Sequence, residues 1–268
     1  VAIDGKTWRG SFDKASGKSA IHMVSAWATA DRLSLGQVVV DEKSNEITAI
    51  PALLKLLELK GCLVTIDAMG CQTAIAEAIL DRGADYVLAV KDNQPTLHRA
   101  IEDFFTSQME DDFARVDVGR FETREKGHGR VEHRAYYVCD APADLADRGR
   151  WKSLAAIGVA INITTRNGKT SDAVRYYILS RRLEAKEFAD AVRGHWGIEN
   201  SLHWQLDVSF GEDACRVRLG LADANLSVVR RAALGMLKNE KSEKIGVKNK
   251  RLAAACNTRY MEKVLTGS

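Results

Sequence analysis

The sequence predicts an α/β protein in which helices flank a mixed β-sheet and a β-rich insertion precedes a helix with a central glutamate. Over the first 110 residues, short apolar runs of strand length alternate with segments of helical periodicity. Between residues 113 and 180, apolar and polar side chains alternate as they do in antiparallel strands. Helical periodicity returns at Glu184 and continues toward the C-terminus.

The first part of the chain has the expected order β-β-β-α-β-α-β-α. The strands are predicted at residues 1–4, 22–29, 33–40, 62–67 and 85–90, and the helices at residues 47–59, 73–81 and 95–109. A hairpin is expected around Ala30 to Arg32. Pro51 falls near the predicted start of its helix, where proline is tolerated.

The second part contains the insertion and the remaining helices. Strands are predicted at residues 121–124, 131–138, 155–164 and 173–179, with Asn167-Gly168 as a two-residue hairpin turn. A helix is predicted at residues 219–238, and a basic tail at 241–251 leads into a short final helix. We therefore expect a core in two parts, residues 1–112 and 183–240, an insertion at 113–182, and a tail at 241–268.

Composition indicates a globular protein of a reducing compartment. The chain has 268 residues, a formal net charge of +3 and five cysteines, with no C-x-x-C pair. An odd number of unclustered cysteines argues against a disulfide framework and favours the cytoplasm. We expect no membrane association, because no apolar run has the length of a membrane span. Because Val1 already lies in a predicted strand, we also expect that an N-terminal region of the natural protein is missing.

The helical segment at residues 183–206 carries charged groups on its apolar face. At about 100° per residue, the stripe is formed by Phe188, Val192, Leu202 and Leu206. Glu199 and His195 lie in the middle of this stripe, and His203 lies at its edge. A buried carboxylate is costly unless it is paired, so Glu199 is either a structural ion-pair partner or a functional group.

Two aspartates follow predicted strands in the same way. Asp4 ends the first strand and Asp67 ends the strand after the first helix. Each could be a simple turn or helix cap. Because functional groups in open α/β sheets gather past the carboxyl ends of strands, the two carboxylates could instead converge with Glu199. Three carboxylates without a thiolate favour Mg²⁺ or Mn²⁺ over Zn²⁺.

A zinc site is an alternative for the histidines. His195, Glu199 and His203 stand four residues apart on one helical face. The spacing is not H-E-x-x-H, because the histidines are two turns apart. Packing against the apolar stripe is the commoner role for such histidines.

Basic residues accompany the proposed site. The candidates for phosphate contacts are Lys6, Lys91, Arg124, Arg130, Arg193 and His195. Tryptophans near these residues would suit base stacking, so a nucleic-acid partner is expected. Solvated charge on strand edges is the alternative for each of them.

Several motifs together resemble a known family. They are Ile3-Asp-Gly-Lys6, Thr65-Ile-Asp-Ala-Met-Gly-Cys-Gln72, Ala89-Val-Lys-Asp-Asn-Gln94, His195-Trp-Gly-Ile-Glu-Asn-Ser-Leu-His-Trp204 and Leu206-Asp-Val-Ser-Phe-Gly-Glu-Asp213. In this order they are similar to the H-repeat-associated transposases of bacterial insertion sequences. The resemblance covers nearly the whole chain.

The resemblance implies a ribonuclease-H-like catalytic domain of the Asp-Asp-Glu class. Its triad would be Asp4, Asp67 and Glu199, which would hold two Mg²⁺ or Mn²⁺ ions. The implied reaction is hydrolysis and strand transfer on double-stranded DNA at insertion-sequence ends and target sites, by a homodimer assembled on DNA at the bacterial nucleoid. Two alternatives remain open: a metal-dependent nuclease or resolvase on the same fold, and an inactive DNA-binding remnant.

The sequence departs from related transposase families at three positions. Those families place a Tyr, an Arg and a Lys around the glutamate, where this chain has Val192, His195 and Leu206. The phosphate-clamping roles of that Arg and Lys therefore do not transfer to this chain.

Overall fold

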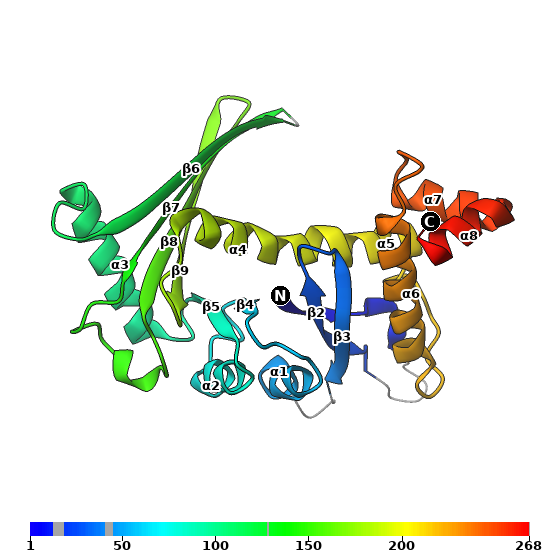
Figure 1. The fold of residues 1–268 in the computed structure, drawn as a ribbon, viewed down its shortest axis with the longest axis horizontal. Helices are drawn as coiled ribbons and strands as arrows, with labels where there is room; N and C mark the ends of the chain where they lie inside the picture. The colour runs from blue at the N-terminus through cyan, green and yellow to red at the C-terminus, as the bar shows by residue number, and fades with distance from the viewer. Residues whose placement is uncertain (13–18, 41–44, 128, 268) are drawn as a thin grey trace. The chain divides into compact units, whose positions relative to one another are not determined.

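The computed structural model describes residues 1–12, 19–40, 45–127 and 129–267 (Figure 1). The chain forms two compact units. Unit 1 comprises Val1–Leu57 and His195–Ser268, and unit 2 comprises Glu58–Gly194. Strands and helices occur in both units, and the predicted mixed α/β class is confirmed. No helix within the described ranges is long and apolar enough to cross a membrane.

The sheet of unit 1 is an antiparallel meander. Its strands are β1 (Ala2–Thr7), β2 (His22–Ala28) and β3 (Leu33–Val40), in the order β3-β2-β1. The predicted hairpin between β2 and β3 is confirmed, and Arg32 in its turn has a φ of 54°. The short 3₁₀ helix η1 (Arg9–Ser11) follows β1.

Helix α1 (Glu46–Lys55) packs against β2 and β3. Asn45 caps it, because its side chain accepts a hydrogen bond from the Thr48 amide and Thr48 bonds back to Asn45. The helix begins one residue earlier than predicted and ends four residues earlier. Pro51 is therefore the sixth helical residue and lies beyond the first turn, so the prediction of its place near the start was wrong. Its missing N–H removes one bond of the helical ladder.

The first half of unit 2 is a βαβ segment. Strand β4 (Leu63–Ile66) pairs in parallel with β5 (Asp85–Val90), and helix α2 (Thr73–Asp81) connects them. Helix α3 (Pro95–Glu110) follows, with Pro95 in its first turn as expected. Because β4 and β5 run in parallel, the residues that follow them emerge at the same edge of the sheet.

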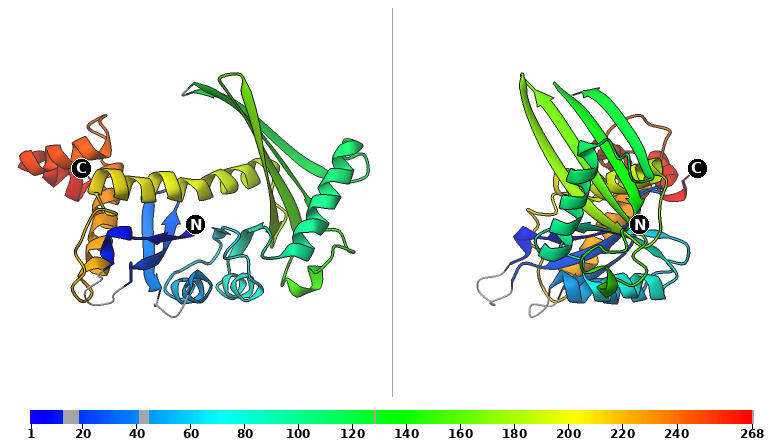
Figure 2. Two further views of the ribbon diagram at one scale, coloured as in Figure 1. Left: turned by 180° about the vertical axis from the view of Figure 1, so that it is seen from behind. Right: turned by 90° about the vertical axis from the view of Figure 1, so that its left-hand side faces the viewer.

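The insertion consists of four long strands. These are β6 (Val118–Gly127), β7 (Arg130–Asp140), β8 (Ala156–Arg166) and β9 (Lys169–Leu179), all antiparallel to their neighbours, with the 3₁₀ helix η2 (Arg148–Arg150) between β7 and β8. Strand β9 also pairs with β5, so these strands extend the sheet of unit 2 (Figure 2). Asn167 and Gly168 form the predicted hairpin tip, with φ angles of 51° and 75°.

Helices pack on both faces of the inserted strands. On one face, Phe105 of α3 stacks on Tyr176. On the other face, Phe188 contacts Tyr136 and Tyr177 edge-to-face. Gly158 permits this approach, since a Cβ atom there would lie 2.6 Å from the Phe188 ring. The helix that carries Phe188 is α4 (Ala185–Ile198).

The helical segment after α4 is not one regular α-helix. A π-helical turn, η3 (Glu199–His203), separates α4 from α5 (Trp204–Phe210). Helix α6 (Ala222–Asn239) follows, then α7 (Val247–Cys256) and α8 (Thr258–Thr266). The prediction of one short final helix was wrong: there are two, and the first begins inside the basic tail.

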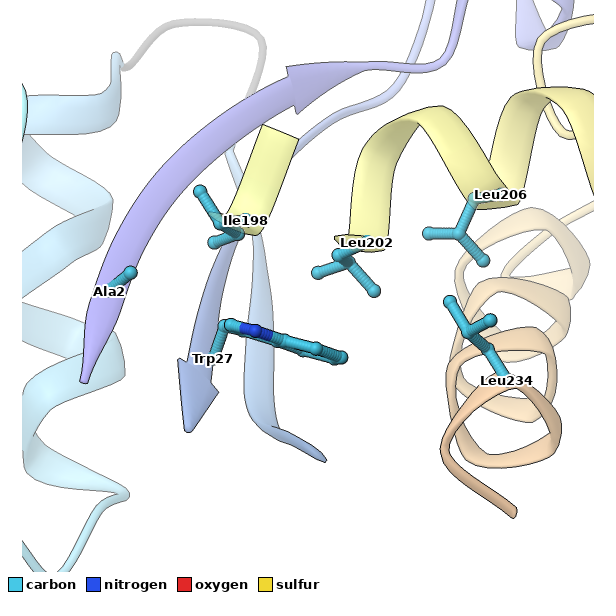
Figure 3. Packing of buried hydrophobic residues seen from close by; sticks show 6 residues of the cluster. All are labelled: Ala2, Trp27, Ile198, Leu202, Leu206 and Leu234. Carbon is cyan, nitrogen blue, oxygen red and sulfur yellow. The ribbon is translucent and has the colours of Figure 1, made fainter. Parts of the chain in front are cut away.

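A hydrophobic cluster in unit 1 joins the sheet to the helices after the π-turn (Figure 3). Its buried members are Ala2, Trp27, Ile198, Leu202, Leu206 and Leu234. These residues come from β1, β2, α4, η3, α5 and α6. The cluster therefore fixes the π-turn against the strand that carries Asp4.

Candidate active site

Asp4 is the third residue of β1, and its carboxylate faces the helices of unit 1. Side chains alternate along a strand, so Asp4 shares a face with Ala2 and Lys6. Its Oδ1 accepts a hydrogen bond from the Gly5 amide at 2.9 Å. Its Oδ2 lies 3.5 Å from Nδ1 of His203, and the carboxylate is only 17% exposed. The carboxylate is thus largely enclosed within unit 1.

His203 is buried and uncharged in this setting. Burial, followed by the charges of Arg231, Lys6 and His195, lowers its pKa to about 3. Within the described part of the chain, the Nε2 atom of His203 has no hydrogen-bond partner.

Glu199 does not lie on the buried face. The prediction placed Glu199 and His195 in the middle of the apolar stripe, but Glu199 is exposed, His195 is half-buried, and Ile198 and His203 are buried. Ile198, the last residue of α4, takes the buried position instead, and the π-turn that begins at Glu199 rotates the side chains that follow it around the axis. Glu199 starts this turn, in the part of the helix where the face changes.

Lys6 lies among carboxylates rather than in solvent. Its Nζ is 2.5 Å from Asp207, 3.3 Å from Asp213 and 3.8 Å from Glu212, and the side chain is 9% exposed. This arrangement favours a structural role for Lys6 over a contact to phosphate.

A buried polar network continues from Glu212, which is fully buried. Arg231 lies 3.5 Å from Glu212, and both residues contact the hydroxyl of Ser227. Arg231 also donates to the hydroxyl of Ser25, at 3.4 Å. The motif that contains Glu212 was visible in the sequence, but the burial of its carboxylate was not predicted. The signal was a Glu-Asp pair at the end of a motif in which apolar and polar residues alternate.

Asp67 belongs to unit 2, directly after β4. Its Oδ1 accepts hydrogen bonds from the amides of Met69 and Gly70, at 3.1 and 3.3 Å. The residue is half-buried. It therefore makes the turn contacts that were the alternative for a strand-end aspartate. Because Asp4 and Glu199 belong to unit 1, their predicted convergence with Asp67 stays a prediction.

The remaining basic candidates differ in their surroundings. Lys91 and Arg124 are exposed. Arg130 lies 3.3 Å from Glu132, and Arg193 lies 2.9 Å from Glu125. Arg193 and Arg134 hold the pKa of the Glu125 carboxyl below its usual value, with the Arg134 hydrogen bond as the main cause. An ion-paired arginine on a surface still carries donors for a phosphate.

The donor set of the three carboxylates fits a hard divalent cation. Carboxylate oxygens without thiolates suit Mg²⁺ and Mn²⁺. Burial, and then the charge of Asp67, raises the pKa of the Cys71 thiol to about 12, so this neighbour stays a neutral thiol. Within residues 1–12, 19–40, 45–127 and 129–267, no three His, Cys, Asp or Glu side chains are grouped so that they could hold a metal ion.

Residues 1–232 match the family model of the transposase DDE domain. The chain belongs to this family. "Putative transposase YncI" of Escherichia coli O157:H7 is 49% identical to it, over 99% of this chain and 68% of the relative. "H repeat-associated putative transposase YhhI" of Escherichia coli strain K12 is 44% identical, over 100% of this chain and 71% of the relative. The predicted relationship to H-repeat-associated transposases is confirmed.

A solved structure also aligns with this DDE-domain transposase. It is the cryo-EM structure of the piggyBac transposase synaptic complex with hairpin DNA, with a TM-score of 0.49 and 9% identity. The alignment covers 98% of this chain and 53% of the piggyBac chain.

Two positions at which this transposase departs from related families belong to its core. Val192 is 5% exposed, and Leu206 is fully buried in the cluster around the π-turn. The third, His195, is half-buried. Apolar packing thus replaces two of the polar side chains that related families place around the glutamate.

Proposed function

We propose that this chain is the ribonuclease-H-like catalytic domain of a DNA transposase, with Asp4, Asp67 and Glu199 as its catalytic carboxylates. It would cleave phosphodiester bonds at insertion-sequence ends and join the freed strand to target DNA. The observation that carries the proposal is that the DDE-domain match over residues 1–232 includes all three carboxylates. Asp67 directly follows β4 and Glu199 begins the π-turn, whereas Asp4 lies within β1 and not at its end, where it was predicted.

The three carboxylates would hold two Mg²⁺ or Mn²⁺ ions. When bound, such ions activate the attacking oxygen and stabilise the leaving oxygen of a phosphodiester. The chain's own residues set the orientation of the ligands. The Gly5 amide and the buried His203 ring fix the Asp4 carboxylate, and the turn amides fix Oδ1 of Asp67. Because Glu199 is exposed, its carboxylate would be accessible to a divalent ion and to DNA.

The DNA would run along the hairpin tips of the insertion. Arg130, Arg166 and Lys169 are register partners on three adjacent strands and are all exposed. Like charges directly opposite each other destabilise a sheet, so a polyanion at this row would relieve repulsion. Arg124 lies on the opposite face, where it lines a hollow of about 290 Å³ with Val131, His133, Ile163 and Thr165. Lys91 and His195 are further candidate contacts.

The decisive experiment combines two assays on the full-length protein with DNA that contains an insertion-sequence end. Cleavage that requires Mg²⁺ or Mn²⁺ would exclude an inactive remnant. Joining of the cleaved 3′ end to a second duplex would exclude a nuclease or resolvase. Cleavage should occur in a homodimer on DNA, which the mass of the complex would test. We place the active protein at the nucleoid in the cytoplasm.

A further inference from the structure

The turn that carries Asp67 is held by side chains from another loop. The turn spans Asp67 to Cys71 and leads into α2, and the contacts come from Asn93 and Gln94, in the loop between β5 and α3. Nδ2 of Asn93 donates to the carbonyl of Ala68 at 2.6 Å and lies 3.5 Å from the carbonyl of Cys71. Nε2 of Gln94 donates to the Cys71 carbonyl at 3.0 Å.

These contacts act on the backbone that orients the carboxylate. The amides of Met69 and Gly70 bond to Oδ1 of Asp67, and both lie between the two carbonyls that the loop holds. Fixing the carbonyls of Ala68 and Cys71 therefore fixes the direction of these amides. Oδ1 of Asp67 follows, because a carboxylate that accepts two amide hydrogen bonds has little freedom to rotate.

The choice of residue types supports this role. Gln94 is the N-cap residue of α3, a position that prefers Ser, Thr, Asp or Asn. Its side chain makes no cap hydrogen bond and points to Cys71 instead, although the residue is only 8% exposed. A side-chain amide is also neutral. It can hold the carbonyls without offering a positive charge that would compete with a cation for Asp67.

We propose that Asn93 and Gln94 are positioning residues that hold the Asp67 turn, and through it the Asp67 carboxylate, in its working orientation. The proposal rests on the proposed catalytic role of Asp67 for its functional consequence. It accounts for the motif Ala89-Val-Lys-Asp-Asn-Gln94, of which Asn93 and Gln94 are the last two residues.

The test compares Asn93→Ala, the double variant Asn93→Ala/Gln94→Met, and the control Asn162→Ala, which removes a side-chain amide from β8 in the same unit. Amide hydrogen exchange at Met69 and Gly70 should be about tenfold faster in the double variant, since each lost hydrogen bond loosens the turn. The exchange of core amides in β5 should not change. Asn93 is exposed, so its single variant keeps the test valid if the double variant folds poorly.

Titration with Mn²⁺ separates this proposal from the proposed function. In the wild type, Mn²⁺ should broaden the amide signals of Met69 and Gly70, and the double variant should need several-fold more Mn²⁺. If Mn²⁺ leaves the wild-type signals sharp, the metal role of Asp67 is wrong, and the exchange rates alone decide the positioning role. Unchanged exchange at Met69 and Gly70, or an equal rise throughout unit 2, would overturn that role.

Discussion

The charged side chains of unit 1 differ in their surroundings, and these indicate which of them stabilise the fold. Lys6 and Arg231 lie beside buried or half-buried carboxylates, so their charges serve the fold. Glu199 differs from them because it is exposed. Substitutions at exposed positions usually change stability little, so the effect of removing the Glu199 charge can be read from catalysis.

The first prediction concerns Glu199→Gln, which removes the charge and keeps the shape. If Glu199 is a metal ligand, metal-dependent DNA cleavage should fall by roughly a hundredfold or more, as when electrostatic stabilisation of a transition state is lost. Because Glu199 is exposed, the melting temperature without metal should stay within a few degrees of wild type. Glu262→Gln, an exposed glutamate of α8, is the matched control and should leave cleavage unchanged. A Glu199→Gln protein that nicks DNA at the wild-type rate would return Glu199 to a structural role.

At the scale of elements, strands and helices with regular periodicity could be predicted from the sequence. The π-turn that interrupts the helical segment could not. Strand β5 and helix α2 have the predicted bounds, because apolar runs and a Gly83 stop signal define them locally. The π-turn has no such signal, since an extra residue in one turn leaves the apolar spacing on either side intact. A strict 3.6-residue period placed Glu199 on the buried face, which Ile198 and Leu202 occupy in the structure.

The candidate site was predictable in part for the same reason. Asp4 lies in β1 and Asp67 directly follows β4, and strands are visible in the sequence. The contact of His203 with Asp4 and the burial of Lys6 depend on long-range packing, which no local pattern encodes. The contacts of Asn93 and Gln94 with the Asp67 turn likewise join segments that are distant in sequence.

The second prediction concerns the π-turn itself. Deleting the exposed Asn200 should convert η3 into a regular α-turn and leave Leu202 and Leu206 in their buried places. The fold should survive with a melting temperature at or above that of wild type, while DNA cleavage is lost because Glu199 is redirected. Deletion of Asp190, exposed in α4, is the control. It rotates the helix that follows by about 100° and should destabilise the protein strongly. Wild-type cleavage after deletion of Asn200 would show that the π-turn has no role in catalysis.

The third prediction concerns the contact among α6, α7 and α8. Glu240 follows α6, accepts a hydrogen bond from the Tyr260 hydroxyl at 2.7 Å and lies 3.1 Å from Nζ of Lys250. Hydrogen bonds from Ser242 first, and then from Tyr260 and Lys250, lower the pKa of Glu240 to about 2 from its ordinary 4.5. A lowered folded-state pKa stabilises the protein above the unfolded value, and this stability is lost as the pH falls toward 2. Wild type should therefore melt higher than Glu240→Gln at pH 7, and the difference should shrink between pH 4.5 and 2. A difference that does not change with pH would contradict this role.

At the scale of the whole molecule, the proposed triad draws on both units. Asp4 and Glu199 belong to unit 1 and Asp67 to unit 2. Contact with DNA can be examined within unit 2 alone. The hairpin tips belong entirely to that unit, and their register separates the basic side chains onto two faces.

The fourth prediction uses this separation. Arg124 and Arg130 lie on opposite faces of the sheet, because Arg124 pairs with His133 whereas Arg130 pairs with Gly127, three residues further along β6. Reversing one charge at a time, in Arg124→Glu or Arg130→Glu, therefore shows which face meets DNA. The affinity for duplex DNA with an insertion-sequence end should be measured by fluorescence anisotropy over a series of salt concentrations. Each lost phosphate contact should reduce the slope of log affinity against log salt by about 1.

Because Arg130 lies in the row of like charges, Arg130→Glu is the variant expected to reduce the slope of log affinity against log salt. Its neighbours Arg166 and Lys169 stand in the same row, so Arg166→Glu should have the same effect and should add to it. Arg150→Glu, in η2, is the control for the change in net charge and should keep the wild-type slope. A flatter slope with Arg124→Glu alone would move the contact to the face with the hollow. If Arg124→Glu, Arg130→Glu and Arg166→Glu all keep the wild-type slope of log affinity against log salt, the hairpin tips do not touch DNA. The row of like charges would then have to be balanced by an anion other than DNA.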